Sequence, residues 1–265
     1  MRRYINLTAL ILFVVVSAGC AKPVPKVAKP AEGRRTRLAA QLEQGVEKFR
    51  GATNTVKGLA WVDLDTADED WKTEAAIVVR RPDLLRIDVM DSLADVWAKI
   101  GSDGKDVWLY VPGKKKLYKG RASSRNMMRL TSFDSEPGDL VSLITGMPPL
   151  PENMELVQLG GSGNRHFVDR VSGVHVWIEK GRKRRIARCA RYSQDGATDY
   201  EIVFSDYRRT GGVDYPYAID ASFPRNGARL RLEYKDVVLG GDVPDDAFAP
   251  PVRRRGKTVR LKDRR

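Results

Sequence analysis

Between residues 56 and 238 the sequence divides into short apolar segments separated by glycine, aspartate and proline. Apolar and polar side chains alternate within many of these segments, and turns such as Ser102–Lys105 join them. Short segments with this punctuation are typical of an antiparallel meander. The expected strands of the first half are Val56–Leu64, Trp71–Val79, Leu84–Met90, Val96–Gly101, Asp106–Val111 and Lys116–Lys119. The chain is therefore predicted to be mainly β.

The same pattern resumes near Met154, after one interruption, and continues to the end of the predicted domain. The expected strands of this half are Arg165–Val171, Gly173–Lys180, Arg184–Tyr192, Thr198–Asp206, Tyr217–Phe223 and Ala228–Val238. The glycine-rich segment Gly160–Gly163 lacks the spacing of a nucleophile elbow and is interpreted as a hairpin turn.

Two segments show helical spacing instead. In Thr36–Phe49 one face carries Leu38, Leu42, Val46 and Phe49, and Gly51 follows as a stop signal. The second helix begins near Pro137, with acidic residues at its start, and ends at Gly146. Its apolar residues are Leu140, Val141, Leu143, Ile144 and Met147.

About a dozen strands and two short helices do not make two layers of equal size. We expect one strongly curved antiparallel sheet, an incomplete β-barrel, with an α-helical lid on its concave side. Beneath thin helices such a sheet can keep an apolar cavity that suits an acyl chain. The same residues could instead form a fully packed core, and periodicity does not separate the two alternatives.

The N-terminus has the features of an export signal. Arg2 and Arg3 precede the apolar run Leu7–Ala18, which is too short to span a bilayer. The following Val16–Cys20 resembles a bacterial lipobox, which implies cleavage before Cys20 and lipidation of its thiol. An ordinary signal peptide and an uncleaved anchor are the alternatives. Residue 21 is alanine rather than aspartate, which by analogy with enterobacterial sorting favours the periplasmic face of the outer membrane.

This interpretation divides the chain into a signal peptide (1–19), a Pro/Lys-rich tether (20–33), one domain (34–250) and a basic disordered tail (251–265). The segment Arg253–Arg265 holds eight Lys/Arg and one Asp, about half of the net charge of +13. A high pI raises the question of nucleic acid, but export argues against it. A solvated tail is the simplest interpretation, and contact with anionic lipid head groups is the functional alternative.

Residues that could support catalysis are scattered. His166 and His175 fall in one expected hairpin without Cys or carboxylate at ligand spacing, so they are interpreted as strand histidines rather than a metal site. Cys189 alternates with arginines as on a strand, and a small buried thiol is expected there. The sequence shows no cofactor fingerprint. We predict a protein that is not an enzyme and has no cofactor or metal.

Five segments, in this order, resemble the LolA/LolB lipoprotein-localisation superfamily: Arg81–Arg86, Ser102–Lys105, Val107–Pro112, Leu140–Pro149 and Leu230–Phe248. LolA is a soluble carrier and LolB is itself a lipoprotein, so Cys20 favours LolB or a LolB-like branch. The resemblance implies an incomplete β-barrel with a lid over a hydrophobic cavity. The implied partners are acylated lipoproteins and a LolA-type periplasmic carrier, and a monomer is expected.

The resemblance also implies a protruding loop with an exposed apolar residue for membrane insertion. The corresponding connection is Met90–Asp95, where Leu93 is the apolar residue within a polar turn. Leu93 could instead pack back on the sheet. The implied function is insertion of lipoproteins into the outer membrane. The alternative is a structural envelope lipoprotein that docks a protein partner with the same sheet.

The lipobox generates a direct test. Replacing Cys20 by alanine should abolish lipidation, because the acceptor thiol is lost, and should leave soluble or unprocessed protein. Mass spectrometry of the mature wild-type chain is expected to show lipid on Cys20. Recovery of an unmodified Cys20 would contradict the prediction, and fractionation with the inner membrane would contradict the sorting analogy.

Overall fold

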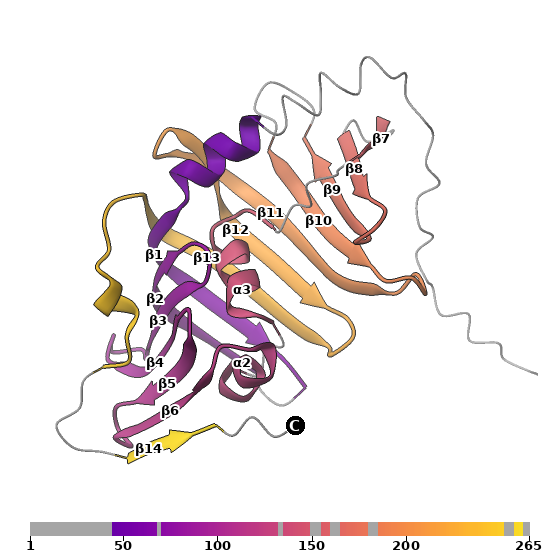
Figure 1. Ribbon diagram of the computed structural model, residues 1–265. Coiled ribbons are helices and arrows are strands. Elements are labelled where there is room, and N and C mark those ends of the chain that lie inside the picture. Colours follow the sequence, from indigo (N-terminus) through magenta and orange to yellow (C-terminus); the bar gives the residue numbers. More distant parts are fainter. Residues whose placement is uncertain are drawn as a thin grey trace, which may run out of the picture.

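A computed structural model describes residues 44–67, 70–131, 135–148, 155–159, 165–179, 185–251 and 257–261. The strands in these ranges form a single 14-stranded sheet, in the order β14-β6-β5-β4-β3-β2-β1-β13-β12-β11-β10-β9-β8-β7. Neighbouring strands are antiparallel except β14, which is parallel to β6. Figure 1 shows that the sheet is open and strongly curved. The predicted fold class is thereby confirmed.

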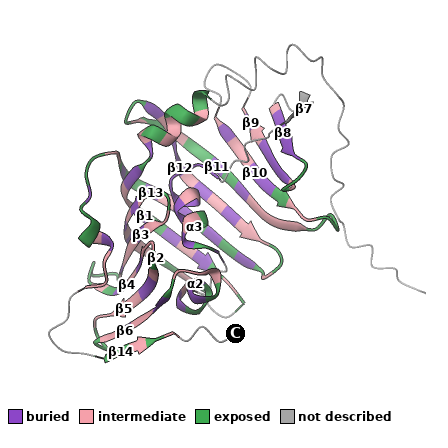
Figure 2. Cartoon of the chain, viewed as in Figure 1, coloured by how far each residue is buried: buried purple, intermediate pink, exposed green. Residues whose placement is uncertain are grey.

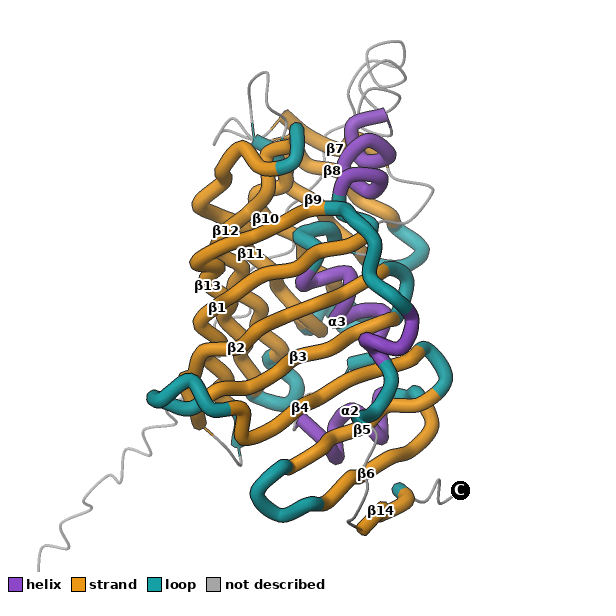
Figure 3. The backbone as a smooth tube through the Cα atoms, turned by 90° about the vertical axis from the view of Figure 1, so that its left-hand side faces the viewer, coloured by secondary structure: helices purple, strands orange, loops and turns teal. Residues whose placement is uncertain are grey.

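The strands of the first half lie close to their predicted bounds. They are β1 (Thr55–Asp65), β2 (Asp70–Arg80), β3 (Leu84–Met90), β4 (Val96–Asp103), β5 (Asp106–Val111) and β6 (Lys116–Arg121). Their register is interrupted between Leu59 and Ala60, where β1 meets β13, and between Val89 and Met90, where β3 meets β4. Such bulges bend strands and increase their twist, which contributes to the curvature seen from the side in Figure 3.

The strands of the second half continue the sheet on the other side of β1. They are β7 (Glu155–Leu159), β8 (Arg165–Asp169), β9 (Val174–Ile178), β10 (Ile186–Tyr192), β11 (Thr198–Thr210), β12 (Val213–Phe223) and β13 (Ala228–Leu239). Because β13 pairs with β1, the last long strand of the chain closes onto its first strand. The two halves therefore share one continuous apolar face.

Within the described residues, three α-helices lie on the concave side. The first is described over residues 44–52, and it is followed by α2 (Ser124–Thr131) and α3 (Pro137–Ile144). Figure 1 shows α2 and α3 inside the curve of the sheet. The first helix passes through Gly51, so the predicted stop there is wrong. The chain leaves the helix at Thr53, whose hydroxyl donates to the Phe49 carbonyl at 2.8 Å.

Helix α2 was not predicted from the sequence. In its eight residues only Met127 and Leu130 are buried apolar side chains, because the remaining positions are mostly polar or exposed. Two apolar positions three apart are too few to establish a helical period. Tertiary packing of Met127 against the sheet decides the helix instead.

Alternation of side chains along each strand separates the two faces of the sheet. On β1, Val56, Ala60, Val62 and Leu64 are buried, while Trp61 and Asp65 are exposed. The buried residues of this face join those of α2 and α3 in one core cluster. Figure 2 shows the buried positions running across the middle strands behind α3.

The convex face is covered at β3 to β5 by the segment after β13. Its short 3-10 helix η1 (Asp245–Phe248) contacts β3 and β4. The indole of Trp108 donates to the Phe248 carbonyl at 3.0 Å, and both side chains are fully buried. The same indole lies directly over Gly101, where an added Cβ would come within 2.2 Å of Trp108 Cζ2. Gly101 therefore makes room for the tryptophan.

Two arginines attach the same segment to the sheet. Arg80 donates to the Val243 carbonyl at 2.8 Å, pairs with Asp245, and lies over the Phe248 ring. Arg86 donates to the Ala247 carbonyl at 3.1 Å. The terminal Asp/Phe segment that contributed to the family resemblance thus acts as a clasp on the convex face.

The prediction of a disordered tail is wrong for residues 257–260, which form β14 (Lys257–Arg260). The Lys257 amide donates to the Lys115 carbonyl and the Leu261 amide to the Lys119 carbonyl. Leu261 packs where Gly120 has no side chain, since a Cβ on Gly120 would lie 2.7 Å from Leu261 Cβ. The charges of the tail suggested disorder, but Val259 and Leu261 alternate with charged residues as on a strand.

The clasp predicts that Phe248→Ala lowers the free energy of unfolding by about 3–5 kcal/mol, because a fully buried aromatic side chain is removed. Urea unfolding followed by tryptophan fluorescence measures the loss. Asp246→Ala, an exposed position in the same 3-10 turn, is the matched control and should change stability by less than about 0.5 kcal/mol. Equal effects of the two variants would contradict the clasp.

Candidate functional site

Helix α3 is delimited by local sequence. Pro137 occupies its first turn, where the missing N–H is not needed, and Asp139 places a carboxylate near the positive end of the helix dipole. The helix ends where Gly146 adopts a φ of 72°, a left-handed conformation that favours glycine. This agrees with the predicted start and stop of the lid helix.

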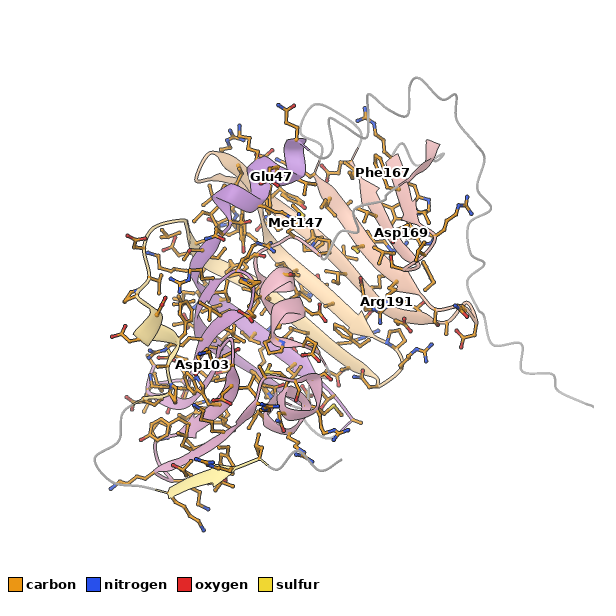
Figure 4. The ribbon with its side chains drawn as sticks, viewed as in Figure 1. Glu47, Asp103, Met147, Phe167, Asp169 and Arg191 are labelled. Atoms are coloured by element: carbon orange, nitrogen blue, oxygen red, sulfur yellow. The ribbon has the colours of Figure 1, made fainter. Side chains whose placement is uncertain are left out.

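The apolar face of α3 is fully engaged with the sheet. The exposed fractions of Leu140, Leu143, Ile144 and Met147 are 6%, 3%, 1% and 3%. Helix α3 contacts β2 and β3, and Met147, labelled in Figure 4, lies three residues after its last residue. Val46 of the first helix is partly buried and packs against the same core. The other predicted lid residues, Leu38 and Leu42, lie outside the described residues.

Two tyrosine hydroxyls meet at the end of the lid. Tyr215 of β12 and Tyr234 of β13 both donate to the Ile144 carbonyl, at 2.6 Å and 2.9 Å. Burial raises the pKa of both hydroxyls, so both remain protonated donors across the physiological range. We call this arrangement the tyrosine latch. It fixes the C-terminal end of α3 over the centre of the sheet.

A half-buried arginine lies beside the latch. Arg81 donates to the Thr145 hydroxyl, and its Nε has no hydrogen-bond partner among the described residues. Burial, together with the nearby Arg50, lowers the pKa of Arg81 to about 10, so it still carries its charge at neutral pH. A cation at a helix C-terminus interacts favourably with the helix dipole. Arg81 therefore reinforces the position of the lid.

Sequence reasoning did not identify the tyrosine latch. Strand alternation places Tyr215 and Tyr234 on the same face as their apolar neighbours, and this much is visible in the sequence. Their common acceptor lies 71 and 90 residues away along the chain. Only the folding of α3 onto the concave face brings the three groups together.

Two surface hollows lie outside the lid. One of about 360 Å³ is lined mainly by charged residues of β1, β11, β12 and β13, among them Asp63, Glu201 and Arg231. The other, of about 450 Å³, lies between the first helix, Arg80 and residues 240–243. Their charged and polar walls do not suit an acyl chain. An acyl-binding cavity under the lid thus remains a proposal.

The connection between β3 and β4 presents Leu93 to solvent. The side chain is 82% exposed, which excludes the alternative in which it packs back on the sheet. The Asp91 carboxylate accepts hydrogen bonds from the amides of Leu93 and Asp95, at 2.9 Å and 3.0 Å. The Asp91 amide in turn donates to the Asp95 carbonyl. These bonds hold the turn in a shape that directs Leu93 outward.

Trp97, close to this turn on β4, is a further exposed apolar residue, with an exposed fraction of 48%. It falls at the bulge between β3 and β4, where Val96 pairs with Met90 and Ala98 pairs with Val89. Trp97 is the extra residue of this bulge, and its side chain is accessible to solvent. The bulge position was not evident from the sequence, which gave no reason to select this tryptophan.

The histidines lie on neighbouring strands, as predicted. His166 Nε2 and His175 Nδ1 are 2.9 Å apart, and Trp177 stacks on His166. Burial lowers the pKa of both, that of His166 to about 4, so both imidazoles are neutral at neutral pH. Among the described residues, no three His, Cys, Asp or Glu side chains are placed so that they could hold a metal ion.

Cys189 is fully buried, as predicted for a structural thiol. Burial raises the pKa of its thiol to about 12, which keeps the reactive thiolate scarce at neutral pH. Within the described ranges, the helices are too short or too polar for a membrane crossing. Cys20 lies outside these ranges.

The fold is similar to that of several solved structures. One is a domain described as an outer membrane lipoprotein-sorting protein from Vibrio parahaemolyticus, at 18% identity and a TM-score of 0.52, covering 78% of this chain and 97% of that chain. A DUF1329 family protein from Desulfovibrio piger is 12% identical, with a TM-score of 0.54, and the match covers 80% of this chain and 96% of that chain. A LolA superfamily protein from Nitrosomonas europaea is 15% identical, with a TM-score of 0.50, and the match covers 80% of this chain and 97% of that chain.

No protein-family model and no curated protein matches the sequence. At identities of 12–18% the likeness to solved structures concerns the fold. The chain has a LolA-like fold: a large, curved, open sheet with helices on its concave face. This agrees with the resemblance seen in the sequence, while the specific LolB branch is not established.

The tyrosine latch predicts that Tyr215→Phe/Tyr234→Phe loosens α3. Loss of two hydrogen bonds should lower the free energy of unfolding by about 1–3 kcal/mol. Hydrogen exchange of the α3 amides should accelerate more than that of β1 and β2. Hydrogen-exchange mass spectrometry measures both regions in one experiment.

Tyr207→Phe is the matched control, because its hydroxyl donates to the Ile186 carbonyl between β11 and β10, away from the lid. It should leave exchange in α3 unchanged. If α3 in the double variant exchanges as slowly as in wild type, the two hydroxyls do not hold the lid.

Proposed function

We propose, from the LolA-like fold of this chain, that it is a membrane-anchored lipoprotein that receives acylated lipoproteins under its lid and helps insert them into the outer membrane. The observation that carries the proposal is the placement of α3 over the apolar concave face. A helix held there by side-chain packing and a few hydrogen bonds can be displaced by a ligand of the same polarity. Lipidation of Cys20 would keep the domain at the membrane surface.

The energetics of the lid agree with acyl binding. Burying each of Leu140, Leu143 and Ile144 stabilises the closed lid by about 1.5–3 kcal/mol, or roughly 5–9 kcal/mol together. An acyl chain gains about 0.8 kcal/mol for each methylene buried. About ten methylenes would therefore offset the loss of the lid contacts. A fatty acyl chain of ordinary length supplies that number.

Leu93 supplies the second part of the proposed function. Cargo that leaves the cavity must cross the lipid head groups, and an apolar side chain on a tight turn can enter that layer. Full burial of one leucine gains roughly 1.5–3 kcal/mol, which permits reversible contact but not anchoring. The exposed position of Leu93 and the fixed shape of its turn support this role.

The proposal predicts that Leu93→Glu separates transfer from binding. Folding and binding of a fluorescent fatty acid should stay near wild type, because Leu93 makes no core contact. Transfer of an acylated lipoprotein to phosphatidylcholine vesicles should fall by about tenfold or more, since the membrane contact is lost. Val238→Glu serves as the control. Val238 is also apolar and is 50% exposed, but it lies near the C-terminal end of β13, at the end of the sheet opposite Leu93.

Two results would overturn the proposal in different ways. If Leu93→Glu transfers cargo as well as wild type, Leu93 is not the membrane-contacting residue. If the wild-type protein binds neither acylated lipoproteins nor fluorescent fatty acids, lipid handling fails as a function. Docking of a protein partner by the sheet then becomes the better interpretation.

A further inference from the structure

Three parts of the chain meet at one end of the sheet. Because β3 to β6 are successive antiparallel strands, the β3–β4 turn (residues 91–95) and the β5–β6 turn (residues 112–115) open at the same end. The start of β14 joins them there, since β14 is parallel to β6 and Lys257 pairs with Lys116. Figure 3 shows the β5–β6 turn beyond the left-hand ends of these strands.

This end carries a dense group of positive charges. Lys114 and Lys115 lie in the β5–β6 turn, and both are exposed. Lys116 begins β6, and Lys257 and Arg260 belong to β14. We call these five residues the basic edge. They derive from two segments that are more than 130 residues apart in the sequence, and β14 alone unites them.

The register of β14 places like charges opposite one another. Lys257 faces Lys116, and Arg260 faces Lys119. Like charges on facing strands repel, so the pairing is favoured when anions lie against it. Asp103 of β4 and Asp106 of β5 compensate the second of these pairs in part, since Asp106 pairs with Lys119 at 2.9 Å and Asp103 lies 3.9 Å from it.

Acidic residues at the same end are separated from the basic edge. Asp91 and Asp95 lie in the β3–β4 turn, and β4 is two strands from β6, which is about 10 Å at the usual strand spacing. Asp65 ends β1 and Asp70 begins β2, four and three strands from β5, which is about 19 Å and about 14 Å at the usual strand spacing. Charges beyond about 8–10 Å are largely screened at physiological ionic strength. Among the described residues, positive charge therefore predominates at the basic edge.

We propose that the basic edge binds the phosphate head groups of anionic phospholipids and holds this end of the sheet against a bilayer. Charge complementarity selects a negatively charged surface, and the occupant is a membrane because the exposed Leu93 lies at the same end, two strands away. An apolar tip beside a basic strand edge matches a bilayer, where apolar chains lie beneath phosphates. The inference rests on the proposed function for the orientation of Leu93 toward lipid.

The test uses the chain from residue 20 onward with Cys20→Ser, which keeps every described element and has no lipid of its own. Its binding is measured by co-flotation with phosphatidylcholine vesicles and with vesicles in which a third of the lipid is phosphatidylglycerol. Each lysine near an anionic surface contributes about fivefold in binding. Lys114→Gln/Lys116→Gln/Arg260→Gln should therefore reduce binding to the anionic vesicles by at least about tenfold.

Lys48→Gln/Lys57→Gln/Arg209→Gln is the matched control. It removes the same charge from the first helix, from the start of β1 and from the end of β11, all at the opposite end of the sheet. Its binding to anionic vesicles should stay within about twofold of the protein without these changes. Equal losses in the two triple variants would show that net charge alone acts, and would overturn the proposal.

Two further outcomes decide the remaining alternatives. If the protein prefers neither vesicle, or if its binding does not fall as salt is raised, the edge does not bind anionic lipid and an acidic protein becomes the better partner. Fatty-acid binding is measured on the same samples. If the Cys20→Ser chain without further substitutions binds no fatty acid, the proposed function is wrong. The comparison of the two triple variants would still decide whether the basic edge contacts anionic lipid.

Discussion

The concave face of the sheet must be shielded from water, and α3 provides the central part of that shield. Apolar residues of β1, β2 and β12 line this face, and an open sheet cannot cover them by closing on itself. The face of α3 that meets them is buried almost completely. Roughly 5–9 kcal/mol from three side chains exceeds the 1–3 kcal/mol from two tyrosine hydrogen bonds. Apolar burial therefore holds the lid in place, and the hydrogen bonds determine its position.

The convex face is shielded by a different device. There the chain returns after β13 and places Phe248 beside Trp108, with Gly101 leaving space for the indole. Arg80 and Arg86 fix the backbone of the same segment. Because this cover consists of the chain itself and includes a fully buried aromatic pair, it is suited to be permanent. The lid on the concave face is a single eight-residue helix, α3, and is suited to be exchanged.

The open sheet also has an edge that needs protection. The edge strand β14 carries lysine and arginine, which oppose pairing with a strand of another molecule. The same charges, together with those of the β5–β6 turn, generate the basic edge. Protection of the edge against strand pairing and contact with an anionic surface are compatible, because both depend on positive charge along an exposed strand. The lid, Leu93 and the basic edge thus serve one proposed function, in which the protein takes up apolar cargo and contacts a membrane.

Much of the fold could be predicted from local pattern. Strand alternation and turn residues located the strands of both halves, and Pro137 and Gly146 delimited α3, because these signals act within a few residues. Export and lipidation at Cys20 were predicted from the N-terminal sequence and remain predictions. Where a signal was short, as in α2, or was outweighed by charge, as in β14, prediction failed.

Tertiary structure decided everything that joins distant segments. The sequence placed Leu93 in a polar turn but did not distinguish exposure from packing; hydrogen bonds to Asp91 settle the conformation and the side chain is free of the sheet. The tyrosine latch, the Trp108–Phe248 clasp and the basic edge each unite residues at least 71 positions apart. The sequence by itself determined which segments are strands and which faces are apolar, because those depend on neighbours in the chain. Which faces meet depends on the curvature of the whole sheet, and only the folded chain has that curvature.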